Sequence, residues 1–426
     1  MLFRFLSFLF LVVGCAGATF AIRDVTVVDP TGGPSQPHST VVVHGEKIAA
    51  FGPTASTPIP KDARVVEGRG KFLIPGLWDM HVHLWYPQNQ LPAYLAQGVT
   101  GVRDMGSDFT RVAAWRKAIL DGKALGPHVL TSGPAVMGKP SDDPKLPSIV
   151  ASTPEEARRA VDRLEDMGVD FIKVLSNVPQ DAYIALAERA RHEEIDFAGH
   201  VPNEITAWDA LEARQNSIEH MFGMTKAMAD DPGRALETFN EDKLKAFCER
   251  SVLFKTYQVP SLTLWSRMIG IDVNDARLKA VPMSIRSTWE KPEDPGDNAE
   301  ILRKQLVLLR RMLVLMQRWG VGILAGTDTG DPYTIPGVTL QDELAMMVQS
   351  GLTPSEALRS ATIAPAKYLG WDETVGQIRK NFLADMVLLD SDPLVDIRNV
   401  GKVAGVSIRG RWIGRTALKA LAASSN

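Results

Sequence analysis

The feature that most constrains the fold is an alternation of short apolar runs with longer amphipathic stretches between residues 73 and 372. This alternation is typical of βαβ units around a parallel sheet, and eight such units predict a (β/α)8 barrel. Thr153 and Thr353 each precede proline and acidic residues, a common helix start. We predict strands over residues 74–83, 99–105, 129–132, 171–175, 197–200, 217–220, 252–259 and 322–327, and helices over 154–167, 180–192, 207–214, 299–319 and 340–349.

The two ends of the chain have a different pattern, in which short apolar runs are broken by Gly and Pro. Such runs are typical of strands joined by turns. Because both ends carry them, we expect strands from the two ends to pair with each other. The predicted fold class is therefore α/β: a (β/α)8 TIM barrel over residues 73–372, with a small β-sandwich domain built from residues 19–72 and 373–426.

The composition is that of a globular protein and argues against several functions. Of 426 residues, 45% are hydrophobic and 23% charged, which are ordinary values. There are 47 Lys and Arg against 50 Asp and Glu, so the chain lacks the basic footprint of a nucleic-acid-binding protein. Only two cysteines, Cys15 and Cys248, are present, which excludes a disulfide framework and a Cys-rich metal site. A metal ion would need His, Asp, Glu or Lys ligands.

Residues 1–18 have the pattern of a secretory signal peptide: Arg4, an apolar run over 5–13 and then small residues. The run is too short to span a bilayer as a helix. Two processing outcomes stay open. Cleavage could fall before Thr19, or the Val12-Val13-Gly14-Cys15 segment, which resembles a bacterial lipobox, could be lipidated at Cys15; we favour lipidation. The expected location is across the inner membrane, periplasmic or lipid-anchored in the bacterial envelope.

Residues that suit a metal site follow the predicted strands, at the ends where barrels place their active sites. His81 and His83 are two apart on the first strand, so their side chains point to the same side. His200 and His220 end the fifth and sixth strands, and Asp328 follows the eighth. Imidazole and carboxylate together suit zinc-like divalent ions. The set predicts a metal centre.

Lys173 lies inside the apolar fourth strand, where a free cation is costly to bury. Two interpretations are open. The lysine could be ion-paired or could extend its amine to solvent, or it could react with CO₂ to form an anionic carbamate that bridges two metals.

Taken together, these motifs resemble the amidohydrolase superfamily, and within it the imidazolonepropionase-like group that includes prolidase-type dipeptidases. The matching segments are residues 75–83, 171–174, 198–202, 218–220, 326–328, 376–378 and 384–388. The resemblance implies a binuclear centre, expected to hold zinc, with a hydroxide shared between the two ions. It implies one ion on His81, His83 and Asp328, a second on His200 and His220, and carboxylated Lys173 as the bridge.

The predicted activity is metal-dependent hydrolysis of a C–N amide bond, most of all in a dipeptide or an N-acyl amino acid. Of the ligand set, only Asp328 keeps a spare oxygen, so we predict that it is the catalytic proton shuttle. The resemblance also bears on deamination, since mononuclear deaminases of this superfamily use a nearby glutamate, usually three residues on, as proton shuttle. Glu204 follows His200 by four residues, and together with Lys173 this offset argues against deamination.

Two other functions remain open from sequence alone: lactone or phosphotriester hydrolysis at the same site, and a non-catalytic envelope lipoprotein that uses the barrel as a binding module. The expected partner is a small amide or dipeptide substrate, and no nucleic acid is expected. Contact with a membrane is expected only through the N-terminal signal or lipid anchor, and homo-oligomerisation is left open. The candidate substrate-binding residues are Arg103, Asn177, Lys255 and Tyr257.

Overall fold

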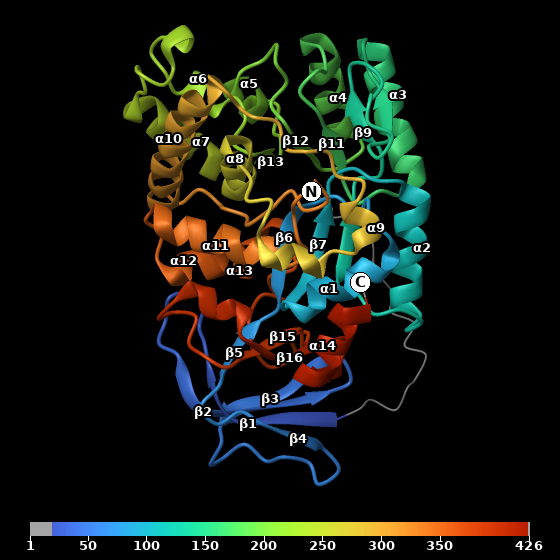
Figure 1. Cartoon of the computed structure of the whole chain (residues 1–426), viewed down its shortest axis with the longest axis vertical. Coiled ribbons are helices and arrows are strands. Elements are labelled where there is room, and N and C mark those ends of the chain that lie inside the picture. The colour runs from blue at the N-terminus through green and yellow to red at the C-terminus, as the bar shows by residue number, and fades with distance from the viewer. Residues whose placement is uncertain (1–18, 425–426) are drawn as a thin grey trace.

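The computed structural model describes residues 19–424 and joins strands from both ends of the chain in one eight-stranded sheet. The predicted signal segment, with Cys15, lies outside the described residues. The strand order is β17-β16-β15-β5-β1-β2-β3, and β4 pairs with β1. Figure 1 shows this sheet at the bottom of the view, in blue and red. Its strands are β1 (Thr19–Val27), β2 (Gln36–His44), β3 (Lys47–Pro53), β4 (Arg64–Glu67), β5 (Phe72–Pro75), β15 (Met386–Leu389), β16 (Val403–Ile408) and β17 (Arg411–Gly414).

The junction between the two ends is the pairing of β5 with β15, in which Ile74 lies opposite Val387. The same sheet has a core to which both ends contribute, with Phe20 and Leu73 from one and Met386 from the other. Hydrogen bonding links all eight strands, so the pairing does not divide them into the two sheets of the predicted sandwich. The two ends therefore fold as one unit.

Two parallel sheets stand above the terminal sheet. One has three strands in the order β6-β7-β8, and the other has six in the order β10-β9-β11-β12-β13-β14. Isolated parallel bridges connect Val82 to Thr329 and Gln258 to Ile323, so residues 323–329 run between β6 and β14. The strands are β6 (Leu77–Val82), β7 (Val99–Asp104), β8 (His128–Thr131), β9 (Ala135–Met137), β10 (Ser148–Val150), β11 (Ile172–Val174), β12 (Phe197–Gly199), β13 (Ser217–Glu219) and β14 (Tyr257–Val259).

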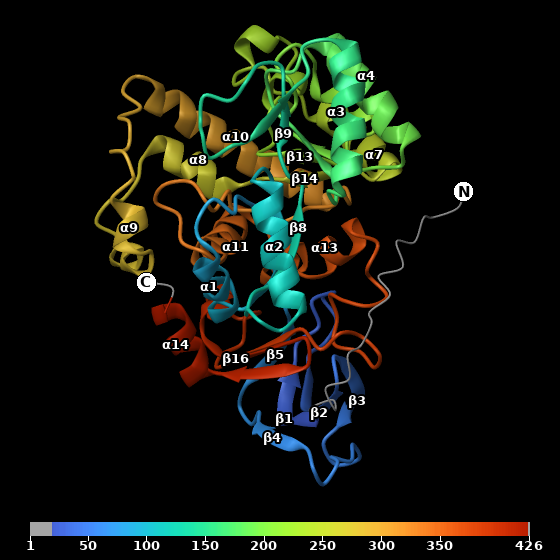
Figure 2. The same ribbon diagram turned by 90° about the vertical axis from the view of Figure 1, so that its right-hand side faces the viewer.

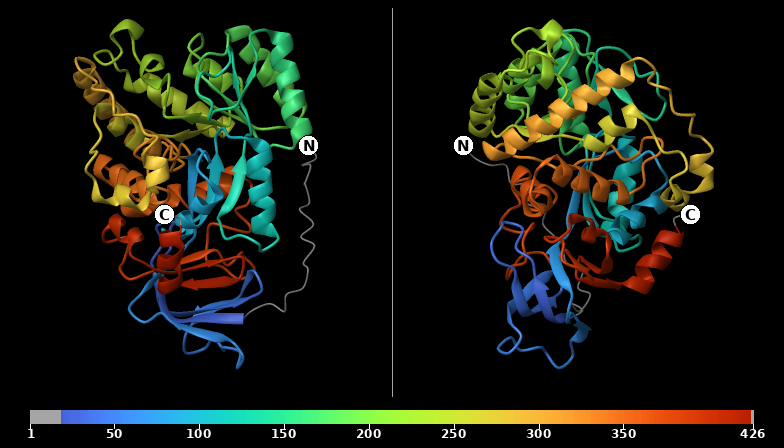
Figure 3. Two further views of the ribbon diagram at one scale, coloured as in Figure 1. Left: turned by 45° about the vertical axis from the view of Figure 1, so that its right-hand side comes forward. Right: turned by 60° about the vertical axis from the view of Figure 1, so that its left-hand side comes forward.

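Helices cover the parallel sheets. Figure 2 shows α2, α3 and α4 facing the viewer, and the two views of Figure 3 show helices on the other sides as well. No helix within residues 19–424 is long and apolar enough to cross a membrane. The α-helices are α1 (Leu91–Ala96), α2 (Phe109–Leu120), α3 (Pro154–Met167), α4 (Gln180–His192), α5 (Ala207–Glu212), α6 (Met224–Ala227), α7 (Glu241–Phe254), α8 (Leu262–Ile269), α9 (Met283–Arg286), α10 (Asn298–Arg318), α11 (Val338–Ser350), α12 (Pro354–Ser360), α13 (Ile363–Tyr368) and α14 (Arg415–Ser424).

The bounds of α3 show how local signals fix a helix. The Thr153 side chain accepts a hydrogen bond from the Glu156 backbone, and Pro154 occupies the first turn. Gly168 then ends the helix in the left-handed conformation, with φ of 77°. The predicted helix over 154–167 is confirmed, as is the one over 180–192.

Two predicted strands differ from the structure. Residues 252–254 belong to α7, where Leu253 is 71% exposed, so this apolar run is an exposed part of a helix and not a buried strand. Lys255 ends that helix with φ of 57°, and β14 begins only at Tyr257. Over 322–327 the chain forms a single bridge at Ile323 instead of a strand.

Candidate active site

The four predicted histidines and Asp328 gather where parallel strands end. His81 lies in β6 and His83 directly follows it, while His200 and His220 follow β12 and β13. Because β12 and β13 are parallel neighbours, the residues after them emerge at the same edge. Asp328 reaches this edge through the segment that bridges to β6, and its backbone N–H donates to the His81 carbonyl at 2.8 Å. All five side chains are buried or nearly so.

One carboxylate oxygen of Asp328 faces two imidazole nitrogens. Its Oδ1 lies 3.2 Å from Nε2 of His81 and 3.2 Å from Nε2 of His83. The opposite ring nitrogens are already bound, because Nδ1 of His81 lies 2.6 Å from Glu219 Oε2 and Nδ1 of His83 lies 3.2 Å from the Gly106 carbonyl. Each Nδ1 must carry the proton, since both partners only accept, so in a neutral ring each Nε2 presents a lone pair to the carboxylate.

That arrangement fits a cation. Nε2 of His81 is buried and has no hydrogen-bond partner among the described residues, and neither has Nδ1 of His220. Ligand atoms of His81, His220 and Asp328 all lie within 4.8 Å of one another. Lone pairs that converge without a donor between them are what a divalent metal ion satisfies, and the acceptors behind the rings orient them as in known metal centres.

His200 and His220 form the second half of the cluster. Their ring centroids are 5.2 Å apart, and the His220 ring is 4.4 Å from that of His81. Nδ1 of His200 hydrogen-bonds to Ser176 at 2.7 Å. Burial lowers the pKa of both rings well below the ordinary value, and the charge of Lys173 adds to the shift at each. Both imidazoles are therefore neutral, as metal ligands must be.

Lys173 lies in the middle of β11 and is 1% exposed. No hydrogen bond or ion pair between residues 19 and 424 engages its amine. Burial lowers the pKa of Lys173 to about 8, although the charges of Glu219 and Asp328 oppose the shift. Among residues 19–424 the side chain is thus neither exposed to solvent nor ion-paired. A share of the amine is unprotonated near neutral pH.

The backbone at two of the proposed ligands is strained. His220 and Met221 have φ of 59° and 54°, and Asp328 has φ of 62°. Non-glycine residues in this region cost about 1–3 kcal/mol each and are concentrated at functional sites. Trp265 holds the His220 carbonyl through an indole hydrogen bond of 2.9 Å.

Two glycines let the Asp328 segment approach β6. A Cβ at Gly326 would lie 2.8 Å from the His81 Cβ, and one at Gly330 would lie 2.4 Å from the His83 carbonyl oxygen. Any larger residue would therefore push the aspartate away from the histidines.

Arg103, predicted as a substrate residue, lies inside the protein. Its guanidinium is fully buried and donates to Glu219, Ser217, Tyr368 and the Met80 carbonyl, which engages four of its five N–H groups. Glu219, which sequence reasoning did not single out, joins Arg103 to the histidine cluster. Burial raises the pKa of Glu219, but Arg103 and the hydrogen bond from His81 outweigh this and lower it.

The other predicted substrate residues are divided between two ends of the strands. Asn177 lies in the loop after β11, at the histidine edge, and its Oδ1 accepts from the Gly138 backbone at 3.0 Å. Lys255 and Tyr257 instead precede or begin β14, at the opposite edge from His220, because Ser217 pairs with Tyr257 at the start of both strands. The sequence analysis placed Lys255 within the strand predicted over 252–259. In the structure Lys255 ends α7, and β14 begins after it, at Tyr257.

Glu204 accepts a hydrogen bond from the Gln180 backbone at 3.1 Å, at the first residue of α4. Its carboxylate therefore serves the start of that helix. This contact agrees with the argument from sequence that Glu204 is not a deaminase proton shuttle.

A cluster of four histidines with a carboxylate, at the ends of parallel strands, is a candidate metal centre and lies where barrel enzymes place their active sites. The chain belongs to the amidohydrolase family, whose model matches residues 72–413, and it is a hydrolase that acts on carbon–nitrogen bonds. This membership confirms the resemblance found in the sequence.

Individual relatives support the same assignment. The chain is 26% identical to ochratoxinase from Aspergillus niger over 419 residues, covering 84% of this chain and 79% of that protein. It is 38% identical to imidazolonepropionase from Salmonella schwarzengrund over 401 residues, covering 84% and 88%. A solved Xaa-Pro dipeptidase with bound methionine is 21% identical and has a TM-score of 0.70, covering 93% of this chain and 100% of that one, which shows a shared fold.

Proposed function

We propose that this protein hydrolyses the amide bond of a dipeptide or an N-acyl amino acid at a centre for two divalent cations. The observation that carries the proposal is the position of Asp328 Oδ1, 3.2 Å from each of two Nε2 atoms whose rings are already held through Nδ1. Such a group of acceptors is stable only with a cation, or a proton, between them.

The cations, which we take to be zinc, have a complete ligand set in this proposal. His81, His83 and Asp328 would hold one ion, and His200 and His220 would hold the other. When bound, they supply Lewis acidity and a water molecule of lowered pKa. Lys173 would supply the anionic ligand of both ions as a carbamate: its unprotonated amine bonds to the carbon of CO₂ and releases one proton, which leaves an anion with two oxygen donors. Its burial without an ion-pair partner supports this role.

Asp328 moves the proton in this proposal. One of its oxygens, Oδ1, is turned to the histidines, so Oδ2 is the atom that accepts a proton from the attacking water. The same oxygen then delivers the proton to the amine nitrogen, without which an amine is a poor leaving group. Arg103 acts at a distance, because it holds Glu219, which orients His81.

The substrate class rests on two kinds of relative. One solved structure of the same fold is described as a Xaa-Pro dipeptidase, and one relative in sequence is described as an ochratoxinase. A dipeptide or N-acyl amino acid substrate is our extension from them to this chain.

Two further assignments belong to the same proposal. The isolated bridges at Val82 and Gln258 support a single (β/α)8 barrel over residues 73–372, with residues 19–72 and 373–426 as a separate β domain. The signal-like first 18 residues support export to a bacterial periplasm or outer envelope.

The test is a hydrolysis screen of the zinc-loaded protein against dipeptides, N-acyl amino acids, lactones and phosphotriesters. We expect turnover of amides that is lost in His81→Asn and retained in His192→Asn, an exposed histidine on α4. Turnover of lactones or phosphotriesters alone would contradict the amide assignment. Failure to bind zinc would contradict the metal centre.

A further inference from the structure

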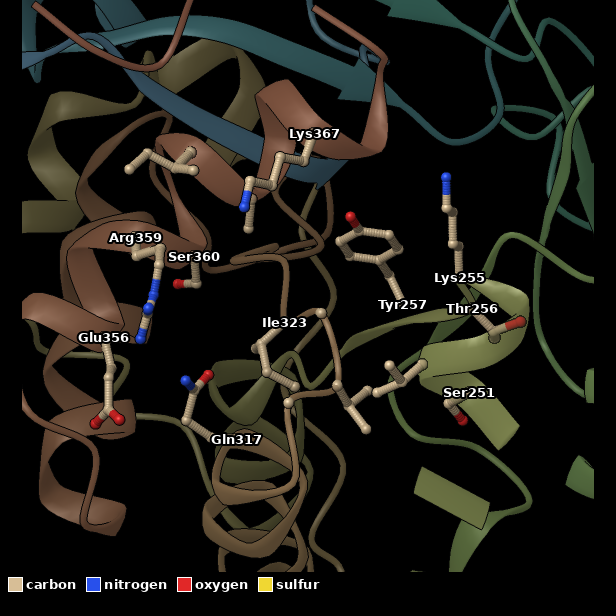
Figure 4. A pocket seen from close by; sticks show the side chains of 16 residues that line it. Ser251, Lys255, Thr256, Tyr257, Gln317, Ile323, Glu356, Arg359, Ser360 and Lys367 are labelled. Atoms are coloured by element: carbon tan, nitrogen blue, oxygen red, sulfur yellow. The ribbon is translucent and has the colours of Figure 1, made fainter. Parts of the chain in front are cut away.

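A cavity of about 290 Å³ lies at the edge of the strands opposite the histidines. It is bounded by the end of α7, the start of β14, the end of α10 and the helices α12 and α13. Figure 4 shows Arg359, Ser360 and Lys367 on one side of it and Lys255 with Tyr257 on the other. Its volume is at the small end of ligand pockets, which hold about 300–1,000 Å³.

The charged residues that line this cavity are mostly cations. Lys255, Arg359 and Lys367 contribute three positive charges, and within residues 19–424 none of the three forms an ion pair. The one carboxylate in the lining is Glu356, whose Oε2 already accepts from the backbone N–H and the hydroxyl of Thr353 in a capping box. The cavity therefore has an excess of positive charge that the protein itself does not neutralise.

Uncommitted polar groups accompany the cations. No hydrogen bond within residues 19–424 engages the Tyr257 hydroxyl or the Gln317 amide. The other hydroxyls are committed to the chain, since Ser360 donates to the Ala357 carbonyl at 2.7 Å and Thr256 to that of Gln215 at 2.8 Å. A guanidinium, two ammonium groups, a phenol and an amide thus remain to bind a ligand.

We propose that this cavity is a binding site for a small multivalent oxyanion, a phosphate or a polycarboxylate. A guanidinium matches two oxygens of such a group in a bidentate contact, and lysines add point charges. The volume fits a small molecule, and the exposed Lys255 and Lys367 lie at its open side. The site is separate from the hydrolytic centre. Tyr257 lies at the start of β14, whereas His220 follows the end of the parallel neighbour β13, so the two sites lie at opposite ends of these strands.

The test uses calorimetric titration of the zinc-loaded protein with inorganic phosphate, phenyl phosphate and citrate, at ionic strength held constant with sodium chloride. The matched variants carry the same change of charge: Arg359→Gln with Lys367→Gln in the cavity, and Arg64→Gln with Lys61→Gln on the exposed surface of the terminal sheet. We expect binding at least about tenfold weaker in the first pair and unchanged in the second, since only the first pair removes charged donors from the cavity.

The milder variant Tyr257→Phe keeps the edge-on ring contact with Tyr368, whose centroids are 5.2 Å apart, and removes only the hydroxyl. We expect it to weaken binding without lowering the melting temperature of the free protein. Preference for the two phosphates would identify a phosphate site, and preference for citrate a carboxylate site; both support the proposal. Equal affinity of the two double variants would overturn it, and so would binding that disappears when the metal is removed.

Discussion

Nδ1 of His81 donates to Oε2 of Glu219 across 2.6 Å, and the other oxygen of that carboxylate receives Arg103 Nη2 at 2.8 Å. All three side chains are fully buried. The Ser217 hydroxyl also donates to Oε1, at 2.5 Å, so the carboxylate has three partners. It orients His81 toward the proposed metal centre and balances the charge of Arg103. Glu219 is a positioning residue, because it acts on the proposed cations only through His81.

Glu219→Gln should weaken metal binding by about 10–100-fold, the usual effect of losing such an orienting partner. The amide leaves the buried Arg103 without a counter-charge, so the melting temperature should also fall. Competitive metal titration and calorimetry measure the two effects. Glu212→Gln, which breaks an exposed ion pair with Arg250, is the control and should change neither. Unaltered metal affinity in Glu219→Gln would show that His81 does not need its partner.

Lys173→Ala should reduce the metal content from about two ions per chain to fewer, because the bridge is lost. Elemental analysis of the loaded protein measures the content. Short carboxylic acids should restore part of the activity by occupying the space of the carbamate, and should do nothing for the unaltered protein. A single ion per chain that is insensitive to Lys173→Ala would contradict the binuclear assignment.

Asp328→Asn should keep both ions, since asparagine retains an oxygen donor, yet lose kcat by at least about 10²-fold, the scale of general acid–base catalysis. Amides with activated leaving groups should suffer least, because they need no proton on departure. The ratio of kcat values for activated and unactivated amides gives an internal control. A loss below about tenfold on an unactivated amide, with the ions in place, would leave Asp328 as a ligand only.

Asp385→Asn tests the joint between the terminal sheet and β8. Asp385 accepts from His128 at 2.7 Å and from the Arg409 backbone at 3.1 Å. Burial raises the pKa of Asp385, but these partners outweigh it and lower the pKa below the ordinary value. The folded state therefore holds the proton less tightly than the unfolded state, so the stabilisation is present above pH about 4 and is lost as the pH falls through the folded pKa.

We expect Asp385→Asn to unfold with about 1–3 kcal/mol less free energy at pH 7, and this difference to shrink on acidification. Urea denaturation at several pH values measures it. The exposed variant Asp62→Asn should match the unaltered protein throughout. A difference that is constant with pH would show that ionised Asp385 is not what stabilises the joint.

Cys15→Ser tests the lipobox. If Cys15 is lipidated, the variant should leave the membrane fraction and change its electrophoretic mobility when expressed in a bacterium. Cys248, which is buried in α7, is the other cysteine of the chain, and Cys248→Ser serves as the matched control. Complete membrane association of Cys15→Ser with unchanged mobility would contradict lipidation.

The sequence could single out the histidines and Asp328 as candidates because each is itself a polar residue at the end of an apolar run. The helices over 154–167 and 180–192 were predictable for a similar reason, since their boundaries depend on nearby residues. Residues 252–254 were misassigned because an apolar triplet reads the same whether a strand buries it or a helix exposes part of it.

The Arg103–Glu219 pair could not be found in the same way. Its members lie on β7 and β13, far apart in sequence, and each alone reads as a charged residue near a strand end. Only the closure of the fold shows that the two charges face each other. The cavity lined by Lys255, Arg359 and Lys367 depends likewise on three separate helices meeting.

The pairing of β5 with β15 bears on how the chain is made. β5 is bonded along one edge to β1 and along the other to β15, whose residues are synthesised near the end of translation. Until β15 emerges, β5 offers an open edge of backbone donors and acceptors, of the kind that recruits strands from other molecules. The terminal sheet is therefore the last part of the molecule to be completed, and premature termination between β5 and β15 leaves the nascent chain with this unpaired edge.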